Sequence, residues 1–263
     1  FIFDVLSEQG IEYDIFIHTW NNKVKYPKYL SDEGTVEELI ELYKPTSYNV
    51  ETYDDKKINE LLNDSKVNEY HDYIDHNNDL NNISDWIGGG LLTNNTISLF
   101  YGLNESNNLR IDSGLKHDII IKTRFDNIMF DKLNIATLSN EENTVYCPMG
   151  YEPDDRERLG TVNDILAVGD EHSMNVYMSL YNRLFNLLKE RYDKKHPRPW
   201  HTIGLTKHNL VKNNIQIKRF YLDHIVTRRL HKYKAVNSVV TGEGWNIVVP
   251  KTDKIILESK NWI

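Results

Sequence analysis

Charged side chains follow a short apolar run in the middle of the chain. Three consecutive isoleucines occupy positions 119–121, and Arg124 and Asp126 come shortly after them. Consecutive β-branched residues are typical of a strand covered on both faces, as in a parallel sheet between helices. In an open α/β sheet, the loops leaving the carboxyl ends of strands frame the ligand crevice. We therefore predict that Arg124 and Asp126 lie in a ligand-binding site.

The residue types around Asp126 suit a hard divalent cation. Mg²⁺ and Mn²⁺ prefer carboxylate and amide oxygens and leave coordination positions for substrate phosphates. Asp126, Asn127 and the late-chain His224 are therefore candidate metal ligands, with Mn²⁺ or Mg²⁺ as the expected ion. Alternatively, Asp126 only caps the strand and His224 is an ordinary hydrogen-bonded histidine. Arg124 either holds Asp126 in place or binds a diphosphate, whose oxygens a guanidinium matches in pairs.

Two further groups stand near the ends of expected strands. Asp164 precedes an apolar segment and is a candidate catalytic base, although it could simply begin that strand. A carboxylate there can take a proton from an acceptor hydroxyl while a metal stabilises a leaving diphosphate. His18, Thr19 and Trp20 end the first expected strand and are candidates for stacking on or hydrogen bonding a ligand base, with Trp20 as a core residue in the alternative. Lys122 either supports phosphate binding or lies on a solvated face.

Other kinds of site are not supported by the residue spacing. The 10 histidines include no His-Glu-x-x-His pattern, and the single cysteine, Cys147, excludes a cysteine-rich zinc site. The three glycines at 88–90 lack the lysine of a phosphate-binding P-loop, so we interpret them as a flexible joint.

Composition limits the function classes. Hydrophobic residues make up 40% of the 263 residues, which is typical of a folded globular protein. The net charge of −8 argues against a broad nucleic-acid interface, which needs a basic face. The chain contains no apolar run of about 18 residues, so we expect no transmembrane segment. The lone cysteine is compatible with a reducing compartment, and we expect a cytoplasmic protein, with peripheral attachment to a membrane as a further option.

Hydrophobic periodicity predicts alternating helices and strands. Helices are expected over residues 1–9, 37–43, 58–62, 93–110, 173–192 and 205–213, and strands over 13–17, 47–52, 119–121, 144–147, 165–168 and 216–222. This alternation indicates one α/β domain with a mostly parallel central sheet flanked by helices. Because a helix enters the first strand, we expect an opening strand to precede residue 1 or to be absent.

Four segments, taken in order, resemble a known family. They are Asp-Ile-Phe-Ile-His-Thr-Trp at 14–20, Tyr-Lys-Pro at 43–45, the segment from His117 to Asp126, and Asn-Asp-Ile-Leu-Ala-Val-Gly at 163–169. This order is similar to that of GT-A-type glycosyltransferases, and more narrowly to polysaccharide and lipopolysaccharide transferases of bacteria and large DNA viruses. The similarity covers roughly residues 1–225.

The resemblance implies a Rossmann-like GT-A fold. A nucleotide-sugar-binding half would span about 1–130 and an acceptor half about 131–235, followed by a β-rich tail at 236–263. Arg124-Phe125-Asp126 would stand where the family has its Asp-x-Asp metal motif, with Asp126 facing the metal and Arg124 replacing the first acid. Asp164 would be the acceptor-side base, and His18, Thr19, Trp20, Arg124 and Asp126 would bind the donor. The family usually begins with a strand and a glycine-containing loop that contacts the nucleotide, and this chain starts after them.

The expected function is therefore transfer of a sugar, of the hexosyltransferase type, in polysaccharide biosynthesis. The sugar would pass from a nucleoside-diphosphate donor to a glycan or lipid-linked acceptor. The alternative is a catalytically silent GT-A-like module that binds a glycan or a partner protein. A third option, a metal-dependent phosphoryl hydrolase using Asp126 and Asp164, lacks the paired metal-binding acids expected of a two-metal site.

Overall fold

The chain forms two compact units that interleave along the sequence. The computed structural model describes residues 2–21, 35–66, 89–125, 127–129, 133, 135, 138, 141–148, 162, 164–194, 202–220 and 224–226. Unit 1 comprises Phe1–Tyr13, Asp118–Met174 and Ile215–Ile263, and unit 2 comprises Asp14–His117 and Asn175–Asn214. The expected boundaries near 130 and 235 do not coincide with this division, and the number of domains stays a prediction.

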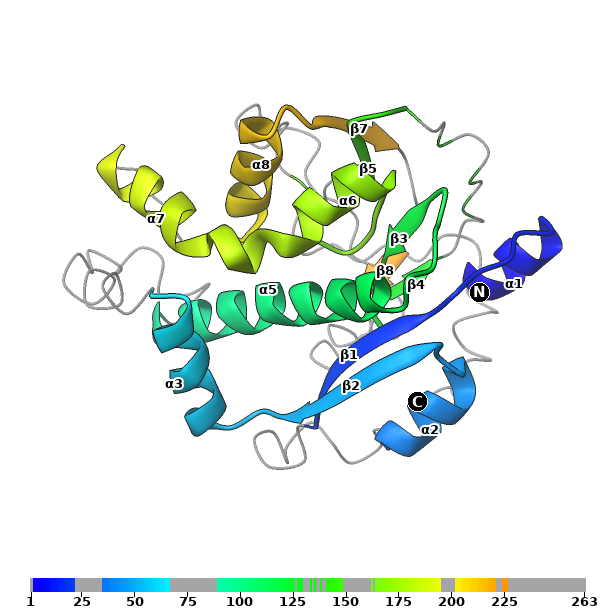
Figure 1. Ribbon diagram of the computed structural model, residues 1–263, viewed down its shortest axis with the longest axis horizontal. Helices are drawn as coiled ribbons and strands as arrows, with labels where there is room; N and C mark the ends of the chain where they lie inside the picture. Colours follow the sequence, from blue (N-terminus) through cyan, green and yellow to red (C-terminus); the bar gives the residue numbers. More distant parts are fainter. Residues whose placement is uncertain are drawn as a thin grey trace, which may run out of the picture. The chain divides into compact units, whose positions relative to one another are not determined.

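Unit 2 contains a parallel pair of strands. β1 (Phe16–Asn21) pairs with β2 (Ser47–Thr52), in register from Phe16 opposite Ser47 to Asn21 opposite Thr52 (Figure 1). Parallel neighbours need a crossover connection, and the connection here includes α2 (Val36–Tyr43). A capping box fixes the start of α2, because Thr35 accepts from the backbone of Glu38 while the Glu38 side chain accepts from the backbone of Thr35.

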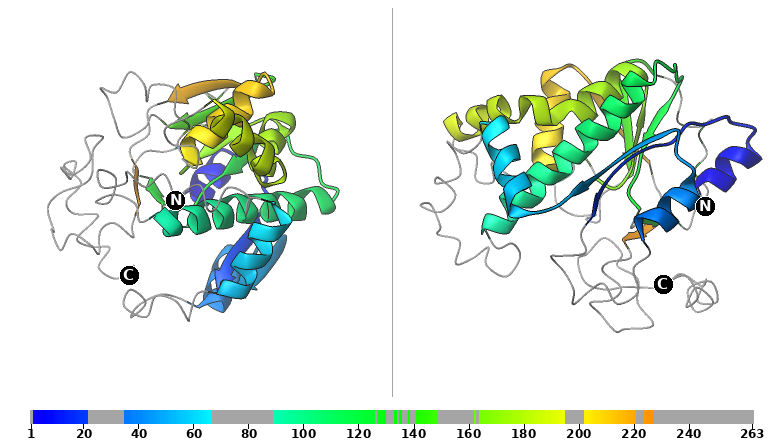
Figure 2. Two further views of the ribbon diagram at one scale, coloured as in Figure 1. Left: turned by 90° about the vertical axis from the view of Figure 1, so that its left-hand side faces the viewer. Right: turned by 60° about the horizontal axis from the view of Figure 1, so that its bottom comes forward.

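Helices cover one side of the β1–β2 pair. They are α3 (Asp55–Asp64), α5 (Gly89–Asp112), the 3₁₀ helix η4 (Ser179–Arg183), α7 (Leu184–Asp193) and α8 (Thr202–Lys212) (Figure 2). The long helix α5 packs against both strands, α3 and η4. Leucine, isoleucine and phenylalanine side chains from these helices form the core of the unit, with Phe100 and Leu184 fully buried at its centre.

Unit 1 is built on a mixed sheet. Its strand order is β3 (Ile120–Lys122), β6 (Ala167–Gly169), β5 (Thr144–Pro148) and β7 (Gln216–Phe220). β6 is antiparallel to both β3 and β5, whereas β5 and β7 are parallel. A second, two-stranded antiparallel sheet pairs β4 (Asn127–Met129) with β8 (His224–Val226). The helix α1 (Ile2–Glu8) contributes Leu6 to the core of this unit, which includes Leu166 and Val168.

The mixed sheet corrects one expectation. The architecture is mixed α/β as predicted, but the prediction of a mostly parallel central sheet is wrong for β6, which is antiparallel to both of its neighbours, β3 and β5. A buried strand reads as a continuous apolar run in either direction, so the pattern at 119–121 and 165–168 could not reveal that these strands run antiparallel.

Most of the expected elements are found near their predicted positions. The strand expected over 13–17 is shifted to β1 (Phe16–Asn21), and β4 and β8 were not expected. The helix expected over 173–192 is α6 (Glu171–Met178), η4 and α7 in succession, so a 3₁₀ segment interrupts it. Gly89 and Gly90 begin α5, so the joint predicted at 88–90 is wrong for those two residues. The tail at 236–263 lies outside the described residues. None of the helices in the described part of the chain is both long and apolar enough to cross a membrane.

The core of unit 2 gives a stability prediction. Leu184 is 0% exposed in α7, and Leu42 is 72% exposed in α2. Leu184→Ala is expected to lower the free energy of unfolding by about 2–5 kcal/mol, because it removes buried methyl groups and leaves a cavity. The matched variant Leu42→Ala is expected to change it by less than about 0.5 kcal/mol. Urea denaturation followed by circular dichroism measures both, and equal losses would contradict the packing described here.

Candidate functional site

Two of the predicted site residues meet in unit 1. Arg124 follows the end of β3 and Asp164 precedes the start of β6. The antiparallel register places Lys122 opposite Ala167, which brings these two strand ends together. Nη1 of Arg124 lies 3.1 Å from Oδ2 of Asp164, and the side chains are 18% and 29% exposed. A predicted donor-binding cation and a predicted catalytic acid, 40 positions apart, therefore form a partly buried ion pair.

Lys122 contacts the same residue from the end of β3. Its side chain lies in the buried interior, and residue 122 is only 4% exposed. Nζ of Lys122 donates a hydrogen bond to the backbone oxygen of Asp164. The interpretation of Lys122 as a solvated surface lysine is therefore wrong, and Asp164 is contacted by two cationic side chains.

The backbone of two predicted metal ligands is brought together by strand pairing. In the β4–β8 ladder, Met129 lies opposite His224, and Asn127 lies opposite Val226. Asn127 and His224 are therefore two positions apart on one ladder although they are distant in sequence. Asp126 lies outside the described residues, as do the side chains of Asn127 and His224.

The described side chains do not test the predicted metal site. Among the residues that the structure describes, no group of three or more His, Cys, Asp or Glu side chains could hold a metal ion. The guanidinium of Arg124 pairs with Asp164; whether it also holds Asp126, as one of the two sequence interpretations required, stays a prediction because Asp126 lies outside the described residues. Occupancy by Mn²⁺ or Mg²⁺ stays a prediction that depends on Asp126, Asn127 and His224.

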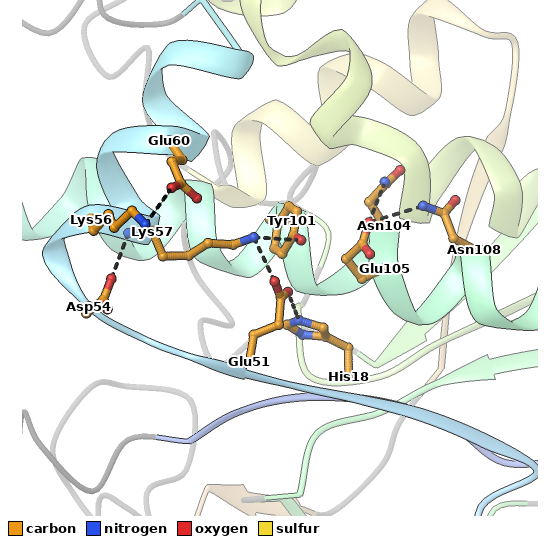
Figure 3. A network of polar contacts seen from close by, with 10 residues as sticks. All are labelled: His18, Glu51, Asp54, Lys56, Lys57, Glu60, Tyr101, Asn104, Glu105 and Asn108. Atoms are coloured by element: carbon orange, nitrogen blue, oxygen red, sulfur yellow. Dashed lines mark hydrogen bonds and ion pairs between the residues drawn. The ribbon is translucent and has the colours of Figure 1, made fainter.

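His18 and Trp20, predicted to contact a ligand base, make internal contacts in unit 2. The His18 side chain is 1% exposed, and its Nε2 lies 2.9 Å from Oε2 of Glu51 (Figure 3). A Cβ at Gly102 would come within 3.0 Å of Nδ1 of His18, so glycine permits the close approach of α5 to β1. The Trp20 ring packs 5.5 Å from Tyr53 and 5.6 Å from Tyr101 between ring centroids.

These contacts favour the core interpretation of Trp20. Trp20 is a partly buried member of the unit 2 core. Thr19 faces the other side of the strand, because successive residues of a strand alternate between faces. Base binding by His18, Thr19 and Trp20 stays a prediction.

A polar network that sequence reasoning missed ties four elements of unit 2 together. Figure 3 shows Glu51 of β2 between the His18 ring of β1 and the Lys57 ammonium of α3. Lys57 Nζ lies 2.7 Å from Oε1 of Glu51 and donates to the hydroxyl of Tyr101 on α5 at 3.1 Å. The Lys57 and Glu51 side chains are 23% and 21% exposed. Lys57 lies in an acidic, polar stretch of sequence, which gave no signal that it was engaged in this way.

In this network, burial and hydrogen bonding shift the pKa values of Glu51 and Lys57 in opposite directions, and hydrogen bonding has the larger effect. Burial on its own would raise the pKa of Glu51, but hydrogen bonds from Lys57, His18 and Tyr101 outweigh burial and lower that pKa. Burial would lower the pKa of Lys57, but its hydrogen bonds to Glu51 and Tyr101 raise it. Mainly through burial, the pKa of Tyr101 rises to about 12. At neutral pH, Glu51 and Lys57 are both charged and Tyr101 is neutral, so the network acts as a structural clamp.

The clamp gives a pH-dependent prediction. Because the pKa of Glu51 is lowered in the folded chain, its contribution to stability is present above the ordinary value of 4.5 and is lost as the pH falls through the lowered value. Glu51→Gln is expected to cost about 1–3 kcal/mol of unfolding free energy at pH 7. The difference from wild type should shrink as the pH falls below that ordinary value.

The control for this experiment is another glutamate of unit 2. Glu60, which lies 3.9 Å from Lys56, is 52% exposed, and Glu60→Gln is expected to change stability by less than about 1 kcal/mol at either pH. Urea denaturation at pH 7 and pH 4 measures both variants. A Glu51→Gln deficit of the same size at both pH values would show that the carboxylate charge does not stabilise unit 2.

Comparison of the chain with protein-family models, with curated proteins and with solved structures gave no match in any of the three. No family is therefore shown for this chain.

Proposed function

We propose that this protein is a glycosyltransferase that moves a sugar from a nucleoside-diphosphate donor to a glycan or lipid-linked acceptor. The observation that carries the proposal is the contact between Arg124 and Asp164, whose terminal atoms lie 3.1 Å apart beside the carboxyl end of β3. It brings together a group suited to bind a diphosphate and a group suited to accept a proton. The ordered sequence motifs that resemble GT-A-type transferases supply the reaction class.

The geometry of Arg124 suits a diphosphate. A guanidinium has five donors in a planar fork, so one edge can face a carboxylate while another faces a phosphate. The contact with Asp164 restricts the orientation of the guanidinium before a ligand arrives, which lowers the entropic cost of binding. In this proposal Arg124 binds the donor diphosphate and offsets the charge that develops on it as the sugar leaves.

Asp164 takes the role of base in the same proposal. The acceptor hydroxyl would give its proton to the carboxylate as its oxygen bonds to the anomeric carbon and the bond to the diphosphate breaks. Asp164 is 29% exposed, so a substrate can approach it.

A divalent metal fits the proposal without being required by the described contacts. Asp126, Asn127 and His224 would hold Mn²⁺ or Mg²⁺, and the ion would stabilise the leaving diphosphate as a Lewis acid. The support is the β4–β8 ladder, which brings the backbone of Asn127 and His224 within two positions of each other. We place the reaction in the cytoplasm, in keeping with the single cysteine, and at a membrane surface if the acceptor is lipid-linked.

One observation favours the rival function, a catalytically silent module that binds a glycan or a partner protein. The carboxylate of Asp164 is already engaged by Arg124. An acceptor hydroxyl would have to share this carboxylate with the guanidinium. Enzymatic turnover of a donor separates the two functions.

The direct test is nucleotide release from a panel of UDP- and GDP-sugars in the presence of Mn²⁺. Wild-type protein is expected to release nucleoside diphosphate from at least one donor when an acceptor glycan is supplied. Asp164→Asn is expected to lower kcat by about 10²–10⁴-fold, because general base catalysis is worth that much. The control is Glu141→Gln in the same unit, whose 45%-exposed carboxylate pairs with Lys218, and its kcat should equal that of wild type.

Two outcomes of this assay would contradict the transferase proposal. Binding of a donor without any release of nucleotide, in wild type and Asp164→Asn alike, would favour the silent module. Absence of binding to every donor, measured by thermal shift, would contradict both the transferase and the assignment of Arg124.

Metal dependence is tested separately. Chelation by EDTA is expected to stop nucleotide release, and added Mn²⁺ to restore it. His224→Ala is expected to raise the Mn²⁺ concentration for half-maximal rate by about 10–100-fold. His208→Ala is the matched control, because His208 pairs with Glu190 in unit 2, 3.0 Å away. An unchanged Mn²⁺ requirement in His224→Ala would remove His224 from the metal site.

A further inference from the structure

Lys122 occupies an unusual position for a lysine. It ends β3 on the same face as Ile120, because residues two apart in a strand share a face, and the two residues are 4% and 7% exposed. Lysine is almost never fully buried unless its ammonium has a partner, since removing the charge from water is costly. An apolar residue at position 122 would fit the pattern of the strand better. The burial of an ammonium group there therefore calls for an explanation.

The partner of the ammonium gives that explanation. Nζ of Lys122 donates to the backbone oxygen of Asp164, and Nη1 of Arg124 lies 3.1 Å from the carboxylate of that residue. Lys122 therefore contacts the main chain of Asp164 and Arg124 contacts its side chain. Lys122 is the last residue of β3 and Arg124 follows two residues later, so both contacts come from the end of this strand.

The residues around Asp164 are anchored by burial. Val162, Ile165 and Leu166 are 0%, 3% and 0% exposed, whereas the Asp164 side chain is 29% exposed. Apolar packing thus fixes the segment on both sides of Asp164. The hydrogen bond from Lys122 fixes the orientation of that peptide group, and with it the direction of the carboxylate.

We infer that Lys122 is a positioning residue for Asp164. This inference rests on the proposed function, in which Asp164 is the base. Lys122 acts through Asp164 and does not contact substrate, so it affects the chemical step and not the binding of the donor. A displacement of about 1 Å in a reacting group can cost about 10²-fold in rate, which sets the size of the expected effect.

The test compares three variants of the full chain. Lys122→Met keeps the length of the side chain and removes the donor, and Lys122→Arg restores a donor and a charge. Lys218→Met is the matched control, because Lys218 lies in β7 of the same sheet and pairs with Glu141 with its side chain 41% exposed. Each variant is assayed for kcat and KM with the donor that wild type uses best.

Lys122→Met is expected to lower kcat by about 100-fold while the KM for the donor stays within about 3-fold of wild type. Lys122→Arg should recover kcat to within about 10-fold of wild type, and Lys218→Met should leave it unchanged. A merely structural lysine would behave differently: Lys122→Met would lose thermal stability and kcat together and Lys122→Arg would not rescue either. That result, or a wild-type kcat in Lys122→Met, would overturn the inference.

Hydrogen exchange measured by mass spectrometry tests the contact of Lys122 with Asp164 independently of transferase activity. Peptides that cover residues 162–169 are expected to exchange faster in Lys122→Met than in wild type, Lys122→Arg or Lys218→Met. If wild type turns over no donor, the transferase proposal fails, but faster exchange would still support the contact of Lys122 with Asp164. Equal exchange in all four proteins would overturn it.

Discussion

The candidate site depends on the pairing of β3 with β6. This ladder is only three residues long, from Ile120 opposite Gly169 to Lys122 opposite Ala167. A slip of one residue would turn Lys122 to the other face of the sheet and separate Arg124 from Asp164. So short a ladder needs support from packing, and it has that support in Leu166, Val168 and their neighbours, which are buried in the core of unit 1. Even Gly169 is required, because a Cβ there would come within 2.8 Å of the backbone oxygen of Thr144.

Partly buried charged side chains are paired differently in the two units. In unit 2, Glu51 and Lys57 neutralise each other, and His18 and Tyr101 complete the hydrogen bonding, so the network joins two strands and two helices without leaving a reactive group. In unit 1, Lys122 and Arg124 both contact Asp164. Lys122 binds the backbone oxygen of Asp164 and Arg124 binds its carboxylate, so both cations hold one partly exposed acid.

Sequence patterns predicted the local structure better than its arrangement. The strand at 47–52 and the helix at 37–43 agree with β2 and α2, because hydrophobic periodicity is a local signal. Strand direction was wrong for β6, since a buried apolar run carries no sign of its direction. The interruption of the helix expected over 173–192 by η4 was also missed. Tertiary packing determines both features.

The sequence predicted those site residues that give a local signal and missed those that depend on long-range contacts. Arg124 and Asp164 were recognised because charged residues directly beside apolar strands are conspicuous, and the structure brings them together. The buried role of Lys122 was missed because lysine is usually solvated, and Glu51 was missed because its partner His18 lies 33 positions away, with nothing local to link them. Long-range polar contacts of this kind leave no periodic signal in one sequence.

The central claim is that the carboxyl end of β3 in unit 1 binds the diphosphate of a nucleotide-sugar donor. A crystal structure of the protein with UDP and Mn²⁺ tests it most directly. The account predicts diphosphate density in contact with the guanidinium of Arg124, with the metal ion beside Asp126 and His224. Ordered UDP bound elsewhere on the chain, with the Arg124–Asp164 pair unaltered and no metal density near His224, would contradict it.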